Sequence, residues 1–153
     1  MKNKDIIALM DYGFSTITTH CLVASAAYSV YKLKKAVINT AMSISMMEDG
    51  FLKDSGIDKI GIFNQRLLEL RQAGKSDELR AEEEKLNRYN ELRKAMMEDE
   101  AEIEKVKLIT YDDWRTLQEE NKNKQINGVE QDILSGEAEM ILENVLWAPP
   151  QEE

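Results

Sequence analysis

Apolar residues in the first third of the chain recur with the period of a helix. Between residues 23 and 51 the spacing alternates between three and four, at Val23, Ala26, Val30, Leu33, Val37, Thr40, Ile44, Met47 and Phe51. A seven-residue repeat of this kind is typical of a helix face that packs along a second helix. A second, mostly apolar row runs from Met10 to Tyr31 and predicts a second buried face. The pattern therefore predicts one long helix from about residue 14 to residue 52.

The first part of this predicted helix carries no charge. Residues 12–31 lie between Asp11 and Lys32 and include no Asp, Glu, Lys or Arg. A helix that is apolar on most sides is buried either in protein or in lipid, and this run is long enough to cross a bilayer. It also contains His20, several Ser and Thr residues and few large aliphatic ones. We therefore favour a buried packing helix, and keep as an alternative that residues 12–31 lie in or on a membrane.

The middle of the chain predicts a short helix followed by a long charged one. Apolar residues recur at helical spacing from Ile60 to Leu70, and Gly74 is typical of the left-handed residue that ends a helix. From Asp77 to about Leu108 a thin apolar stripe runs through a highly charged sequence. That stripe needs a partner to cover it, and the long front helix is the nearest candidate.

The last third of the chain predicts two shorter helices. Thr110-Tyr-Asp-Asp113 is a helix-start signal that leads into Trp114 and Leu117. Asn127-Gly128 predicts a turn. The final helical region, about 129–147, has a break at Ser135-Gly136 and places Ile133, Met140, Ile141, Val145 and Leu146 for burial. No segment shows a convincing strand period.

These elements predict an all-α fold. We expect an elongated helical bundle or helical hairpin with coiled-coil-like packing, made of two long helices plus shorter ones. The length of 153 residues fits a single helical domain. Within it we distinguish an apolar and basic segment, 1–53, an acidic segment, 54–147, and a flexible tail, 148–153, that follows Trp147-Ala-Pro-Pro.

The charge is unevenly distributed and limits the classes of partner. The net charge is −9. Residues 1–53 carry six Lys and four acids, for a net of +2, so the remaining residues carry −11. Binding to nucleic acid needs clustered Lys and Arg, and the only basic cluster is Lys32, Lys34 and Lys35. We therefore expect no direct contact with nucleic acid.

The residue types needed for catalysis are scarce. The chain has one His and one Cys, His20 and Cys21, so neither a His-based zinc site nor a helical di-iron motif can be assembled. These two adjacent residues point about 100° apart on a helix and do not make a nucleophile–base pair. No Gly-rich loop resembles a phosphate-binding motif. We predict no enzyme activity, no catalytic or metal-binding residues, no cofactor and no small-molecule substrate.

The surplus of apolar helix surface favours a structural or interaction protein. We predict a helical subunit of a larger assembly, either a virion or a multi-subunit cellular complex, that acts through the apolar seam and through the acidic face of 77–104. A protein partner or self-association is expected. The interface candidates are Val23, Val30, Val37, Ile44, Met47 and Trp147. Trp147 followed by Pro149-Pro150 fits a docking peptide, and it equally fits a Trp packed on its own bundle.

Two other functions fit the same sequence. The first is a membrane-associated adaptor with residues 12–31 in or on the bilayer. The second is an acidic inhibitor that binds a basic site on a partner protein. With a single cysteine and no recognisable signal peptide, we expect an intracellular protein, in the cytoplasm or within an assembled particle, and a membrane-associated one under the adaptor alternative.

Overall fold

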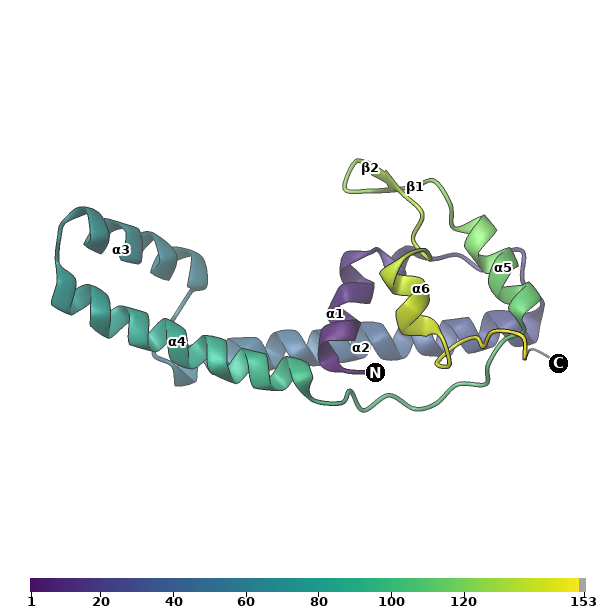
Figure 1. Ribbon diagram of the computed structural model, residues 1–153, viewed down its shortest axis with the longest axis horizontal. Helices are drawn as coiled ribbons and strands as arrows, with labels where there is room; N and C mark the ends of the chain where they lie inside the picture. The colour runs from purple at the N-terminus through teal and green to yellow at the C-terminus, as the bar shows by residue number, and fades with distance from the viewer. Residues whose placement is uncertain (152–153) are drawn as a thin grey trace. The chain divides into compact units, whose positions relative to one another are not determined.

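The computed structural model describes residues 1–151, which are mainly helical (Figure 1). Over these residues the elements are α1 (Asn3–Asp11), η1 (Phe14–Thr16), α2 (Ala24–Asp54), α3 (Ile60–Gln72), α4 (Ser76–Glu98), α5 (Tyr111–Glu120), β1 (Lys124–Ile126), β2 (Val129–Gln131) and α6 (Glu137–Leu142). The predicted helical fold with long helices is confirmed. A small antiparallel sheet, β1–β2, is an addition that the sequence analysis missed. Coiled-coil packing is not shown.

The chain forms two compact units. The first contains Met1–Ala41 and the described residues from Glu100 onward, and the second is Met42–Asp99. The helix α2 begins in the first unit and ends in the second.

The predicted long front helix begins ten residues later than expected. Gly13 has φ +84°, η1 is a single tight turn, and the chain from Ile17 to Val23 is not helical before α2 begins at Ala24. Ser and Thr residues compete with helix formation by offering other hydrogen bonds to the backbone. The predicted apolar row from Met10 to Tyr31 is therefore not one helix face, and this prediction is wrong.

The core of the first unit is built from its helices and from the residues that connect them. α1 packs against α6 and η1. α2 contributes its Val30 face, and the C-terminal elements supply two tryptophans. The fully or almost fully buried apolar residues are Ile6, Leu9, Phe14, Ile17, Ala26, Val30, Leu33, Val37, Ile109, Trp114, Leu117, Ile133, Leu134, Ala138, Leu142, Leu146 and Trp147.

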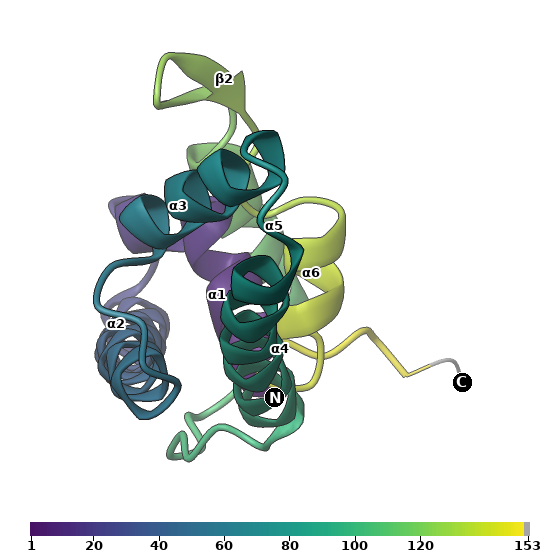
Figure 2. The ribbon, with the colours of Figure 1, turned by 90° about the vertical axis from the view of Figure 1, so that its left-hand side faces the viewer.

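The second unit is a helical hairpin with the end of α2. α3 lies beside α4 (Figures 1 and 2). The cluster at its centre consists of Leu52, Ile57, Phe63, Leu67 and Tyr89, with Phe51, Leu79 and Leu86 packed around it. Gly74 has φ +67° between the two helices, as predicted. The Arg93 guanidinium on α4 pairs with the Glu48 carboxylate on α2 at 3.0 Å.

The long charged helix is shorter than predicted, because α4 ends at Glu98 and not near Leu108. The Met1 carbonyl accepts a hydrogen bond from the Ala101 N–H at 2.9 Å. The Met1 ammonium pairs with the Glu100 carboxylate at 3.1 Å. The segment 99–108 contains no helix. Two causes contribute: the bonds to Met1 hold residues 100 and 101 just beyond α4, and the β-branched residues Ile103 and Val106 disfavour helix.

The C-terminal signals are confirmed in part. The Thr110 hydroxyl accepts the Asp113 N–H at 3.1 Å and caps α5. Asn127 and Gly128 have φ +52° and +79° and form the turn between β1 and β2, as expected for a two-residue hairpin turn. The final helix is only α6, and Met140, which we predicted to be buried, is 75% exposed.

The predicted tail, from residue 148, follows the turn at residues 144–146. Residues 148–151 contain no helix or strand. Residues 152 and 153, the end of the predicted tail, lie outside the described residues.

Replacement of Gly13 tests the packing of the hairpin on η1. A Cβ atom on Gly13 would lie 3.0 Å from the Ile126 Cδ1 atom, whereas one on Gly128 would meet nothing within 4 Å. Both glycines have positive φ, so alanine at either position costs about 1 kcal/mol. We expect Gly13→Ala to lower the free energy of unfolding by more than Gly128→Ala, because Ile126 must move. Urea titration followed by tryptophan fluorescence measures both, and equal losses would contradict the packing.

Candidate functional site

The side chain of Asn121 joins three segments of the first unit. Its Oδ1 atom accepts the Thr18 N–H at 2.9 Å, and its Nδ2 group donates to the carbonyl oxygens of Thr18 and Leu117, both at 2.9 Å. Its own carbonyl oxygen accepts the Ile133 N–H at 3.3 Å. Asn121 is completely buried. A buried amide with this set of partners is satisfied and fixes the position of residue 18 against α5.

The neighbouring Glu120 carboxylate holds the next residues of the same loop. It accepts the backbone N–H groups of His20, at 3.0 Å, and of Cys21. Partial burial opposes its ionisation, but hydrogen bonds from Thr18 and from Cys21 and His20 outweigh burial and lower the pKa of Glu120 to about 2. Glu120 and Asn121 therefore form a structural clamp on residues 18–21.

The structure gives His20 and Cys21 no catalytic arrangement. Both are exposed. Hydrogen bonding to the Glu120 carboxylate raises the pKa of the Cys21 thiol, which moves it away from the reactive thiolate. In the part of the chain that the structure describes, no group of three or more His, Cys, Asp or Glu side chains is placed to hold a metal ion.

A face of α2 in the first unit is aromatic, basic and uncovered. Tyr28 and Tyr31 are 62% and 58% exposed. The Lys32 ammonium lies over the Tyr28 ring, 5.6 Å from its centroid, and Lys35 is exposed one turn farther on. At 100° per residue these positions together lie on the side of the helix away from the buried row of Ala26, Val30, Leu33 and Val37. We call Tyr28, Tyr31, Lys32 and Lys35 the outer face of α2.

The second unit has exposed apolar residues of its own. On the last part of α2 these are Met42, Met46 and Met47, and on α3 they are Ile60, Ile62 and Leu68. They are aliphatic or thioether side chains and include no aromatic ring, so the chemistry of this surface differs from that of the outer face.

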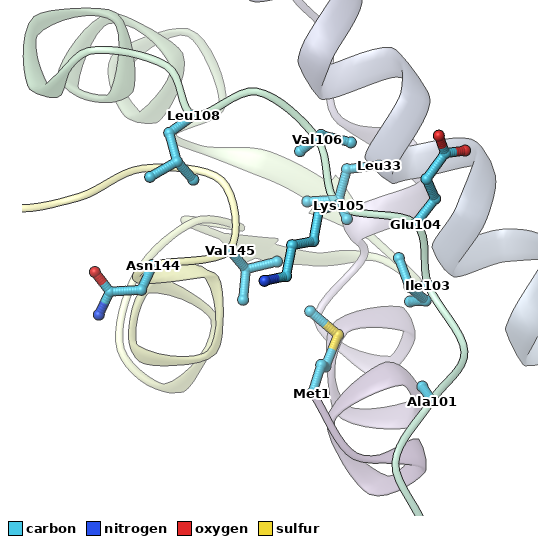
Figure 3. Close-up of a pocket in the computed structure, with 10 residues that line it drawn as sticks. All are labelled: Met1, Leu33, Ala101, Ile103, Glu104, Lys105, Val106, Leu108, Asn144 and Val145. Atoms are coloured by element: carbon cyan, nitrogen blue, oxygen red, sulfur yellow. The ribbon is translucent and has the colours of Figure 1, made fainter.

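A pocket of about 390 Å³ opens in the first unit beside the segment 99–108 (Figure 3). Its walls are mainly apolar and come from the N-terminal residue, α2, this segment and the residues after α6. The lining residues are Met1, Leu33, Ala101, Ile103, Glu104, Lys105, Val106, Leu108, Asn144 and Val145. Apolar concave sites of this size with a few polar groups are typical of ligand sites.

One wall of this pocket is held only at its ends. The Ala101 N–H donates to the Met1 carbonyl at 2.9 Å, and the Ile109 N–H donates to the Leu146 carbonyl at 2.8 Å. Between Glu104 and Leu108 the described structure shows no hydrogen bond to a backbone N–H or C=O group. We call residues 102–108 the strap. Movement of the strap between Glu104 and Leu108 would therefore break no backbone hydrogen bond that the structure shows.

The predicted interface residues fall into two groups. Val23 is 60% exposed and Met47 is 40% exposed. Val30, Val37 and Ile44 are fully buried, so in this structure the chain itself covers the seam. Whether the seam also meets another subunit stays a prediction.

Trp147 lies inside the first unit. It is 6% exposed and stacks on Trp114 with ring centroids 5.1 Å apart and an interplanar angle of 8°. Tyr111 contacts the same ring at 5.9 Å. Both buried indole N–H groups lack an acceptor among the described residues, so stacking and apolar contact hold the pair.

Sequence reasoning missed both of the uncovered features. The sequence pattern places Tyr28 and Tyr31 on an apolar row that predicts burial, and it predicts the strap to be the end of a helix. The β-branched residues Ile103 and Val106 inside a charged run are the available signal against helix. Nothing local marked the tyrosines as exposed.

The structure also bears on the membrane alternative. Of the described helices, none combines the length and the apolar character needed to cross a bilayer. The predicted run 12–31 is divided among a turn, a non-helical stretch and the beginning of α2.

Comparison with family models, with curated proteins and with solved structures found no match to this chain.

Replacing Asn121 by Asp tests the clamp with almost no change in shape. The variant keeps an acceptor for the Thr18 N–H but places a carboxylate oxygen against two carbonyl oxygens. Because a buried donor is lost and a charge is left unpaired, we expect a loss of about 3 kcal/mol in the free energy of unfolding. Gln125→Glu adds the same charge on exposed β1 and should change stability by less than about 0.5 kcal/mol. Similar losses in the two variants would refute the role of Asn121.

The lowered pKa of Glu120 predicts how stability depends on pH. Its value in the folded chain, about 2, lies below the ordinary 4.5. Its contribution is therefore complete above pH 4.5 and is lost as the pH falls toward 2. We expect Glu120→Gln to cost about 1 kcal/mol at pH 7, a low value because the carboxylate is partly solvated, and to weaken the acid dependence of unfolding. The control Glu119→Gln, whose carboxylate is exposed and pairs with Lys122 at 2.8 Å, should preserve that dependence.

Proposed function

We propose that this protein is a non-enzymatic interaction subunit of a larger assembly, and that it binds a partner protein through the outer face of α2. One observation carries the proposal. Tyr28 and Tyr31 are more than half exposed on a helix whose opposite face is fully buried in its own core. Single exposed apolar residues are ordinary, but two adjacent tyrosines with a lysine over one ring form a patch of the kind found at interfaces.

The spacing of this face supports a helical partner. Ala24, Tyr28, Tyr31 and Lys35 follow the four-three-four spacing of a seam. Ala24, like the two tyrosines, is exposed. In this proposal the coiled-coil-like contact predicted from the sequence forms on the outer face, with a helix of another polypeptide, while the Val30 face remains in the core.

The charges of the outer face specify the partner further. Lys32 and Lys35 border the tyrosines in a chain whose net charge is −9. Tyrosine supplies a large contact area with a polar end, and the lysines favour carboxylates around it. We propose a partner with an apolar stripe bordered by Asp or Glu. The acidic face of 77–104 supports the proposal less, because Glu82 and Glu83 already pair with α3 arginines at 3.4 and 3.2 Å.

A membrane surface is the second candidate. Tyr and Lys side by side also suit the boundary between lipid headgroups and acyl chains. This alternative places α2 on a bilayer and not across it. The same experiment separates the two candidates.

A photo-crosslinking amino acid at position 31 tests the proposal in cells that produce the protein. We expect a discrete adduct with a second polypeptide, absent when the same group replaces exposed Gln125. Because the lysines orient the partner, Lys32→Glu with Lys35→Glu should reduce the adduct about tenfold. Mass spectrometry of the adduct identifies its components.

The outcomes are distinct. An adduct with an acidic polypeptide supports the proposal, and an adduct of two copies of this chain would identify self-association as the function of the face. Lipid adducts alone would contradict a protein partner and favour membrane binding by the outer face. Equal labelling from positions 31 and 125 would refute a specific contact.

A further inference from the structure

The pocket beside the strap has features that the proposed protein contact does not use. It lies in the first unit, and its lining includes none of the four outer-face residues of α2. Leu33, which lines it, is fully buried and belongs to the opposite side of the helix. A ligand in this pocket therefore would not compete directly for the outer face.

The walls of the pocket select an apolar molecule. Met1, Leu33, Ile103, Val106 and Val145 present aliphatic or thioether groups to one space (Figure 3). Transfer of a hydrocarbon chain from water to such walls is favourable by about 0.8 kcal/mol for each buried CH₂ group. The volume of about 390 Å³ is at the lower end of the range of small-molecule sites. It suits a short chain better than a long one.

One polar group of the lining carries an uncompensated positive charge. Figure 3 shows the Lys105 side chain extending toward Val145, with the neighbouring Glu104 carboxylate pointing away from it. Within the part of the chain described, Lys105 has no ion pair. Asn144 also lies in the lining, but Figure 3 shows its amide on the far side of Val145, directed away from Lys105. The group that matches the Lys105 ammonium is a carboxylate.

We propose that this pocket binds a short-chain amphiphile with a carboxylate head, with its hydrocarbon chain against Leu33 and Val145 and its carboxylate on Lys105. The strap gives the ligand a route in. Its backbone from Glu104 to Leu108 has no hydrogen bond to the rest of the described chain, so it can move outward without breaking one. The two bonds at its ends keep it attached while the ligand enters.

The test uses three probes that share one chain length and differ in charge. Octanoate, octanol and octylamine are titrated into the full chain at pH 7 and followed by amide NMR. We expect octanoate to bind at least tenfold more tightly than octylamine, with octanol between them. The largest shifts should fall on Ile103, Lys105, Val106 and Val145. Equal affinities, shifts elsewhere, or no binding of octanoate at 10 mM would overturn the proposal.

Two lysines of the strap provide a matched pair of variants. Lys105 lines the pocket and Lys107 does not, although both are exposed and both carry one charge. We expect Lys105→Gln to weaken octanoate binding about tenfold and to leave octanol binding unchanged, whereas Lys107→Gln should change neither. Equal losses of octanoate affinity in the two variants would show that binding depends only on the net charge of the protein, and would refute the site.

A third variant tests the apolar part. Val145→Phe fills the pocket and should abolish binding of both octanoate and octanol. If it does not fold, as judged by circular dichroism, the lysine pair and the three probes still decide the proposal.

Discussion

The structure of the first unit depends on the amide of Asn121. It donates to the Thr18 carbonyl and accepts the Thr18 N–H, as the backbone of a neighbouring strand would. Both backbone groups of residue 18 are therefore bonded outside a helix. The Glu120 carboxylate accepts the N–H groups of His20 and Cys21, and the Lys34 ammonium on α2 donates to the Ile17 carbonyl at 3.1 Å. The non-helical residues 17–23 are thus held by several hydrogen bonds, and α2 begins only after them. The beginning of α2 is set by α5, about 100 residues away in the sequence.

Burial divides α2 into a covered side and an exposed side. The core of the first unit takes Val30, Leu33 and Val37, and those residues lie on one side of the helix. The tyrosines on the other side face no element of their own unit closely enough to be buried. An outward apolar face costs solubility unless something covers it. The proposed contact outside this chain rests on these exposed tyrosines.

The sequence predicted the elements that local patterns determine and missed those set at a distance. The apolar spacing of α3, the glycine at position 74, the Thr110 cap and the Asn127-Gly128 turn are all encoded within a few residues, and the structure contains each of them. The beginning of α2 and the end of α4 depend on Asn121 and on the N-terminus, respectively. For the candidate site, periodicity placed Val30 and Tyr28 on apolar rows alike, because it registers apolar character and not whether the chain covers it. The pocket could not be predicted while the strap was assigned to a helix.

The two proposed sites share α2 but need not influence each other. A partner would contact the outer face and a carboxylate ligand would contact Leu33 on the inner one, so coupling would require the helix itself to shift. That shift would disturb the packing of Val30 and Val37. Both side chains are fully buried, and a close-packed core resists displacement. The strap is less firmly held, because its half-buried side chains Ile103 and Val106 are not fully enclosed and its backbone has no hydrogen bond to lose between Glu104 and Leu108. Ligand entry is therefore accommodated by the strap, and the coupling free energy between the sites should be small.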